Sequence, residues 1–234
     1  MDEQSLSLSF GDSLSEDVAS IVGEYAELGL DALVEEGLLK DIPIVSTAVA
    51  VYRIGKSIRE KHHISKLISF LNEINKGIAD EEKREQYREK FNSNEKFRNQ
   101  ELEYILLITD RYIGFQKPQM LAKLYLEYLD GSIDWIRFTE YAEIIDRLLA
   151  SDYECLLLLM CHDGIDLGEI SVEIASVLRL LAVGFVTQEQ PAVNALLGMD
   201  GPRDSMDYLF TDYGRRFAEM LESYIRANHR MIHK

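Results

Sequence analysis

The chain of 234 residues is poor in cysteine, proline and tryptophan, and it has no long hydrophobic run. Two cysteines, Cys155 and Cys161, exclude a disulfide framework and indicate a reducing, cytoplasmic compartment. They lie six residues apart in a leucine-rich segment, so apolar packing is favoured over a redox or metal role. Only four prolines and fourteen glycines interrupt the chain, which favours helices.

The longest apolar stretch, residues 42–51, is about half the length of a membrane-spanning helix. Four basic residues follow it directly: Arg53, Lys56, Arg59 and Lys61. This arrangement predicts a buried core helix or, alternatively, a helix lying in the headgroup layer of the inner membrane. In the second case the acidic N-terminal segment would act as a detachable cover and membrane contact would be peripheral.

Catalytic motifs are missing too. The sequence has no glycine-rich phosphate loop, no Gly-x-Ser-x-Gly elbow and no His-Glu-x-x-His. The Cys161–Asp163 triple suggests nucleophilic chemistry, but no second segment offers an evident base. His62 and His63 point to different helix faces among basic neighbours, which disfavours cation binding. We therefore predict a non-enzymatic protein with no catalytic residues, no metal and no cofactor.

The charge is strongly acidic and unevenly distributed. The formal net charge is −16, which repels nucleic acid and anionic membranes unless a local basic face overrides it. Residues 1–41 hold eleven acidic residues and one lysine, whereas residues 42–76 hold six basic residues and two glutamates. We expect the acidic N-terminal helix to lie along the basic central one. The candidate protein-binding residues are Arg53, Lys56, Arg59, Lys61 and Arg203.

Helical periodicity divides the chain into three parts. Residues 1–40 form an acidic arm, with an alternating and hence extended start over residues 1–10, followed by an amphipathic helix. Residues 41–163 form a helical body, which contains a long central helix, 42–76, and a charged hairpin, 80–113. In the central helix we place Pro43 in the first turn and Gly77 at a left-handed C-terminal cap.

Aromatic residues gather in the second half of the helical body, at Tyr112, Tyr125, Tyr128, Trp135 and Tyr141. Their spacing is typical of a helix-bundle core with tyrosine hydroxyls at its rim. A ligand cage is the alternative interpretation of the same residues.

The C-terminal part, residues 166–234, has a different rhythm. A helix over 171–183 ends at Gly184, a strand begins at Phe185, a polar loop follows, and residues 206–210 form a second strand before Thr211 caps a helix. The segments LRLLAVGFVT and YLFTDYGRRFAEML resemble the hydrophobic-Gly-hydrophobic turn and the Leu-Thr-x-x-Gly-x-x-hydrophobic helix start of winged-helix modules. The expected fold is mainly α, a helical bundle with a C-terminal winged-helix-like α+β module containing a small two-stranded wing.

The resemblance to winged-helix modules implies DNA binding or protein docking. The helix before the wing offers few groups that recognise bases, namely Ser171, Glu173, Ser176 and Arg179. In the wing, acidic residues surround Arg203. A DNA-binding regulator therefore remains an alternative, and a protein-contacting module is favoured.

The whole chain also resembles uncharacterised bacterial proteins with a Pro-Ile/Val-hydrophobic-Gly-Lys-x-Ile helix, a charged middle and a winged-helix-like end. That resemblance implies an accessory protein of a phage-defence or mobile-element system. Our leading hypothesis is a cytoplasmic adaptor or accessory protein that acts by binding protein partners. The sequence leaves the partner and the oligomeric state open.

Overall fold

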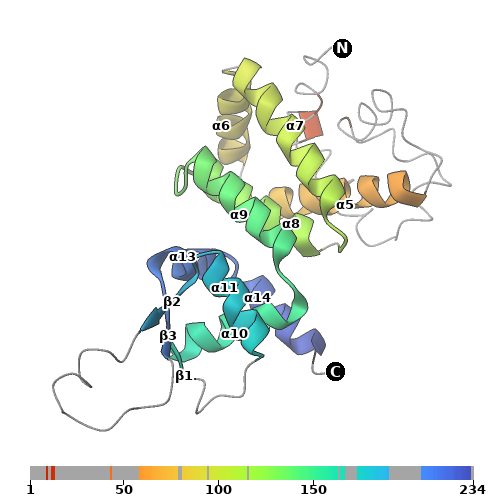
Figure 1. Ribbon diagram of the computed structural model, residues 1–234. Coiled ribbons are helices and arrows are strands. Elements are labelled where there is room, and N and C mark those ends of the chain that lie inside the picture. The colour runs from red at the N-terminus through yellow and green to blue at the C-terminus, as the bar shows by residue number, and fades with distance from the viewer. Residues whose placement is uncertain are drawn as a thin grey trace, which may run out of the picture. The chain divides into compact units, whose positions relative to one another are not determined.

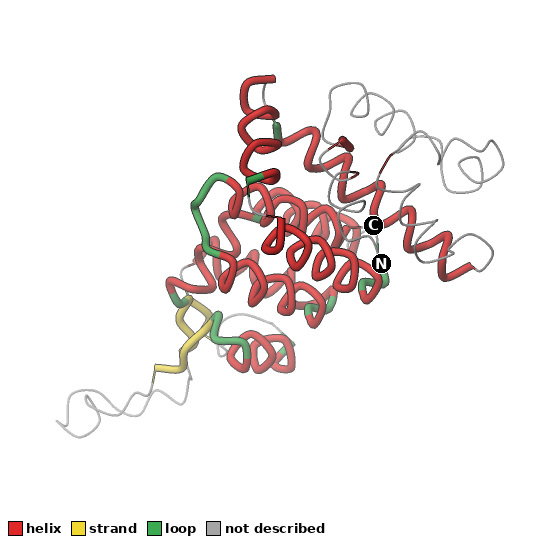
Figure 2. Tube along the Cα trace, turned by 90° about the horizontal axis from the view of Figure 1, so that it is seen from above, coloured by secondary structure: helices red, strands yellow, loops and turns green. Residues whose placement is uncertain are grey.

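The structure of the protein is a computed structural model that describes residues 9, 12–13, 43, 58–78, 81–93, 95–114, 116–162, 164–166, 173–189 and 207–232. The described residues are mainly helical, with one small antiparallel sheet late in the chain (Figures 1 and 2). The predicted mainly α character with a small late sheet is therefore confirmed. The chain divides into two compact units, Met1–Asp146 and Arg147–Lys234.

Little of the chain before residue 58 is described. The first half of the predicted central helix lies outside the described residues except for Pro43, which is helical. Ser9, Asp12 and Ser13 are helical too, and the Ser13 hydroxyl donates to the Ser9 carbonyl at 2.7 Å. The predicted extended conformation is therefore wrong at Ser9, where the local backbone is already helical.

The first unit is built from helices. They are α5 (Ile58–Gly77), α6 (Glu81–Asn92), α7 (Glu95–Arg111), α8 (Gln116–Leu129) and α9 (Trp135–Arg147). Helices α6 and α7 occupy the predicted charged hairpin and bend at Ser93. The core contains Leu67, Leu71 and Ile74 of α5, all at most 3% exposed. Helix α5 packs against α7 and α8.

Gly77 ends α5 for a different reason from the predicted one. Among the described glycines only Gly131 and Gly184 have a positive φ, so the left-handed cap predicted at Gly77 is wrong. A Cβ atom added at Gly77 would lie 2.1 Å from Cδ1 of Leu126 on α8. The glycine therefore serves close helix packing, since a larger side chain would overlap its neighbour.

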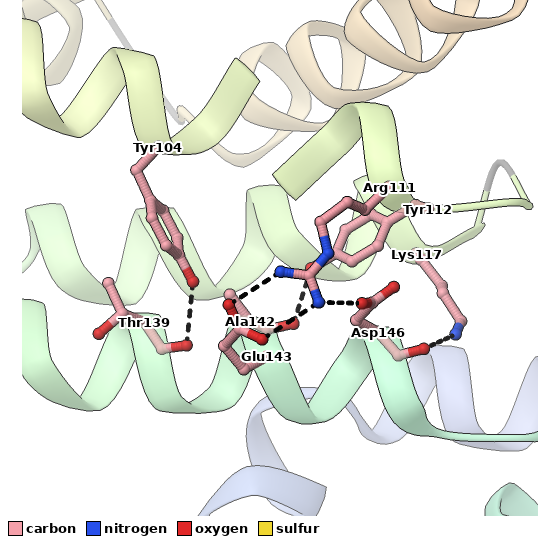
Figure 3. A network of polar contacts seen from close by, with 8 residues as sticks. All are labelled: Tyr104, Arg111, Tyr112, Lys117, Thr139, Ala142, Glu143 and Asp146. Carbon is pink, nitrogen blue, oxygen red and sulfur yellow. Dashed lines mark hydrogen bonds and ion pairs between the residues drawn. The ribbon is translucent and has the colours of Figure 1, made fainter. Parts of the chain in front are cut away.

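Polar contacts join α7 to α9 along their length (Figure 3). The Tyr104 hydroxyl donates to the Thr139 carbonyl at 3.2 Å, and the Tyr112 hydroxyl donates to the Ala142 carbonyl at 2.9 Å. The Arg111 guanidinium donates to the carboxylates of two α9 residues, Glu143 at 3.1 Å and Asp146 at 2.6 Å. Partners advance along both helices in the same direction, so α7 and α9 run parallel.

The second unit combines helices with the sheet. Its elements are α10 (Ala150–His162), β1 (Gly164–Asp166), α11 (Ile174–Ala182), β2 (Val186–Glu189), β3 (Asp207–Phe210), α13 (Asp212–Met220) and α14 (Glu222–Ile232). The strand order is β1-β3-β2, with both pairs antiparallel. The two predicted strands are confirmed. Strand β1 was not predicted, because three residues are too few for an alternating pattern.

Helix α11 ends at Gly184 as predicted, by a left-handed glycine cap. Gly184 has a φ of 79°, its N–H donates to the Leu181 carbonyl at 3.0 Å, and the Phe185 N–H donates to the Leu180 carbonyl at 2.9 Å. Both bonds together form a Schellman motif. Phe185 and Leu180 are fully buried, so the motif turns the chain from α11 directly into the core and then into β2.

Thr211 joins that corner to α13. Its N–H donates to the Phe185 carbonyl at 2.9 Å, and its hydroxyl donates to the Gly184 carbonyl at 2.7 Å. The same hydroxyl oxygen accepts the Gly214 N–H at 3.1 Å, which confirms Thr211 as the N-cap of α13. One side chain therefore starts a helix and holds it against the corner that follows α11.

Candidate protein-interaction surface

Helix α11 carries apolar side chains on its outer face. Ile174 and Leu178 lie one helical turn apart and are 56% and 49% exposed. Ala182, one further turn along, is exposed as well. Side chains spaced by four residues share one face of a helix, so these three form a continuous apolar stripe, the α11 stripe.

The inner face of α11 contains the polar groups. Val177 and Leu180 are fully buried in the core, and Ser176 between them is fully buried too. The Arg179 Nη2 donates to the Ser176 hydroxyl at 2.9 Å and lies 2.8 Å from Oδ1 of Asp152 on α10. The guanidinium of the only basic side chain of the helix is therefore bound to α10 with one third of the side chain exposed, while Ile174 and Leu178 face outward.

Asp152 fixes this orientation. Its carboxylate is fully buried, and Oδ1 also accepts the Arg179 Nε–H at 2.9 Å. Its Oδ2 accepts the N–H of Leu149 at 2.8 Å, which satisfies a free donor at the start of α10. The hydrogen bond and charge of Asp152 raise the pKa of the Arg179 guanidinium, so this cation stays charged and paired.

The pairing of Arg179 with Asp152 weakens the DNA-binding alternative. Recognition of bases and phosphates requires donors on the outer face of the helix that enters a groove. Between Ile174 and Ala182 the candidate donors Ser176 and Arg179 instead bind each other and Asp152. Glu173, at the N-cap of α11, is exposed and acidic. The described part of this helix therefore presents an apolar and acidic face.

Of the five basic residues predicted to bind a partner, only Arg59 has a described side chain. Arg59 pairs with Asp110 at the end of α7, with Nη2 2.5 Å from Oδ2, and its side chain remains 81% exposed. Lys61 lies on α5, and its side chain is outside the described part of the structure. Arg53, Lys56 and Arg203 all lie outside the described residues. The predicted basic face stays a prediction.

Basic side chains of α5 form a polar junction with the end of α7, which the sequence did not predict. Lys66 is only 2% exposed, and its ammonium donates to the carbonyls of Asp110 and Tyr112 at 2.7 Å each. The nearby His62 Nε2 lies 2.8 Å from the Ile113 carbonyl oxygen. Carbonyls at the end of α7 lack helical partners and carry partial negative charge, so basic side chains of α5 satisfy them. The sequence contains one sign of this burial: Lys66 lies one helical turn before the buried Phe70, on the same face of α5.

His63 lies in the same junction, and its protonation affects the stability of the fold. Its side chain is 12% exposed, and Nδ1 is 3.8 Å from Oδ1 of Asp110. Burial lowers the pKa of His63 below 6.5, and the nearby cations Lys66 and Arg59 lower it further. Asp110 and a hydrogen bond with the Leu106 backbone raise the pKa, but they do not offset the effect of burial. The folded protein therefore holds a neutral imidazole where the unfolded chain readily takes up a proton.

We expect the free energy of unfolding to fall as the pH drops below about 6.5, because protons then bind the unfolded state preferentially. The check is urea denaturation at about pH 7.5 and about pH 5.5 for the parent chain and for His63→Gln. The glutamine variant should lose part of this dependence. His162→Gln, at an exposed position of α10, is the control and should keep it. Equal pH dependence in His63→Gln and the parent would contradict the assignment.

The aromatic cluster of the first unit is closed by its own rings. Trp135 stacks on Phe138 with ring centroids 5.1 Å apart, and its centroid lies 5.4 Å from that of Tyr128 and 5.6 Å from that of Tyr104. Rings in direct contact leave no room between them for a ligand. These contacts favour the core interpretation over the cage.

A buried carboxylate anchors the hydroxyls of this cluster. Glu101 is 6% exposed and accepts the Tyr125 hydroxyl at 3.3 Å, and it also accepts the Tyr128 hydroxyl. Burial, followed by the effects of Glu101, raises the pKa of both phenols, so they remain neutral donors. Tyr104 has its pKa raised to about 12, chiefly by burial. These tyrosines act as structural hydrogen-bond donors.

The remaining candidates for chemistry do not converge. Cys155 is fully buried, and burial raises the pKa of its thiol to about 12, whereas Cys161 is exposed. Within the described ranges, no group of three or more His, Cys, Asp or Glu side chains is arranged to hold a metal ion. No helix among the described segments has both the length and the apolar character required to cross a bilayer.

Comparison of the chain with protein-family models, with curated proteins and with solved structures finds no match.

Proposed function

We propose that this chain is a non-enzymatic adaptor or accessory protein that binds another protein through the α11 stripe. The observation that carries the proposal is the exposure of Ile174 and Leu178 on a helix whose Ser176 and Arg179 side chains are bound to each other and, through Arg179, to Asp152. Ile174 and Leu178 are about half exposed, so burying the rest of each side chain at an interface contributes on the order of 1 kcal/mol, and together they supply the core of a small docking site.

The order of elements in the second unit supports a winged-helix-like module as the scaffold of this site. Helix α11 precedes the antiparallel pair β2 and β3, and Thr211 and Gly214 hold α13 against the end of α11. These are the positions that carry the resemblance in the sequence. A module of this kind binds DNA or protein according to the side chains on the helix before the wing. An apolar outer face on that helix favours protein.

The resemblance to bacterial accessory proteins is the ground for proposing a phage-defence or mobile-element setting. The interaction proposed for α11 does not depend on that setting.

The test is capture of cross-linked partners from extracts of the native host. The parent chain should retain a partner that Ile174→Gln/Leu178→Gln loses by about tenfold or more, because both contact side chains become polar without a change in charge. Ile136→Gln is the matched control, since Ile136 is 67% exposed but lies on α9 in the first unit. Urea denaturation verifies that both variants stay folded. Equal recovery with the double variant would refute the α11 stripe as the docking surface.

A further inference from the structure

The charge of the second unit restricts what can bind the α11 stripe. Residues 147–234 contain thirteen Asp and Glu and eight Lys and Arg, which gives a formal net charge of −5 within a chain of −16. Electrostatic complementarity governs which partners approach a surface and which are rejected. An acidic partner would meet repulsion before any apolar contact forms.

Side chains on α11 strengthen this bias. Arg179, the only basic residue of the helix, is one-third exposed, and its guanidinium pairs with the buried carboxylate of Asp152. Glu173 lies exposed at the N-cap, immediately before Ile174. The stripe therefore has an exposed acidic residue at its start, and the arginine beside it already pairs with a carboxylate.

A second copy of this chain fits poorly on such a surface. A two-fold contact brings the same patch of both subunits together, so each α11 stripe would face another one. Two chains of formal charge −16 would then approach through surfaces that each carry an exposed Glu173 and an arginine already paired with Asp152. Charge complementarity therefore favours a basic partner over self-association.

The form of the stripe indicates the secondary structure of that partner. Helix α11 has nine residues, so its axis is about 13 Å long, and Ile174 and Leu178 form a ridge along one side of it. Ridges of side chains spaced by four residues pack into the grooves of another helix. An amphipathic helix matches both the length and the convex form of the stripe.

We infer that the α11 stripe binds an amphipathic helix of a partner protein, with Leu or Ile side chains in helical spacing and Lys or Arg side chains flanking them. This inference rests on the proposed function and adds the chemical class of the partner. The basic flanks of the partner helix are matched to the acidic second unit, and its apolar side chains are matched to Ile174 and Leu178.

The test uses two fluorescent peptides of about 18 residues, long enough to form a helix on binding. One contains leucine in helical spacing with lysine elsewhere, and the other has glutamate at every lysine position. Fluorescence anisotropy with the full chain should show the leucine-lysine peptide binding about tenfold or more tightly than the leucine-glutamate peptide. Binding of the lysine peptide should weaken about tenfold in Ile174→Gln/Leu178→Gln and remain unchanged in Ile136→Gln.

Three outcomes would overturn the inference. Equal affinity for both peptides, lost in the double variant, would retain α11 as a docking surface and refute the basic partner. Lysine-peptide binding that is the same in parent and double variant would show attraction to acidic surface elsewhere. Sedimentation of a parent dimer that becomes a monomer in the double variant would identify a second copy as the occupant.

Discussion

Substitution of Arg179 by methionine is expected to lower the free energy of unfolding of the second unit by about 1–3 kcal/mol, since Asp152 is buried but Arg179 is one-third exposed. The reason is the partner that remains behind. Asp152 is fully buried, and in the variant its carboxylate would lose the guanidinium and keep the Leu149 N–H. Methionine preserves much of the apolar stem, so the effect reports chiefly on an uncompensated buried charge. Urea denaturation of the full chain provides the measurement.

One control separates lost charge pairing from lost packing. Adding Asp152→Asn to Arg179→Met should restore much of the stability, because the neutral amide oxygen can still accept the Leu149 N–H. A loss of stability that Asp152→Asn leaves unchanged would attribute the effect to packing.

The same arginine shows where inference from sequence alone ends. The sequence predicts the helix around Arg179 and names Ser176 and Arg179 as its polar groups. It does not show which way they face, because that depends on Asp152, 27 residues earlier in the chain. A single arginine in an apolar helix fits either a solvated face or a buried pair. Only the tertiary partner distinguishes them.

The first unit gives the same result for its basic residues. Local pattern is sufficient for the α6 and α7 hairpin and for the apolar face of α5, since periodicity is a local property. Arg59, in contrast, pairs with Asp110, 51 residues away, and Lys66 is buried against carbonyls at the end of α7. These two contacts join residues far apart in the chain, so the sequence alone does not reveal them.

Short motifs with steric requirements can be predicted better, because the requirement is contained in the motif. The Thr-x-x-Gly start of α13 is an example. Thr211 caps the helix by accepting the N–H of Gly214, and it also donates to the corner at Gly184. The sequence indicates the cap. The structure adds the reason for the glycine, which is the approach of α13 to the backbone of Phe185.

Replacement of Gly214 by alanine is therefore expected to destabilise the second unit by about 3 kcal/mol. The added Cβ would lie 2.5 Å from the Phe185 carbonyl oxygen and 2.7 Å from the Phe185 Cα. Phe185 cannot easily move away, because its ring packs on those of Tyr213 and Phe217, with centroids 5.5 Å and 4.6 Å apart. Backbone atoms lack the rotamers by which a side chain would relieve the overlap.

Two further glycines provide matched controls by urea denaturation. Alanine at Gly114 meets no atom within 4 Å, so Gly114→Ala should be neutral or stabilising by about 0.4–1 kcal/mol. At Gly184 an added Cβ would make only an ordinary contact with Cδ1 of Tyr213 at 3.9 Å, but φ is 79°, so Gly184→Ala should cost about 1–2 kcal/mol through backbone strain. The expected order of destabilisation is Gly214 first, Gly184 second and Gly114 last. If Gly214→Ala were no more destabilising than Gly184→Ala, the corner would be relaxing, and Thr211 rather than close backbone packing would hold α13 in place.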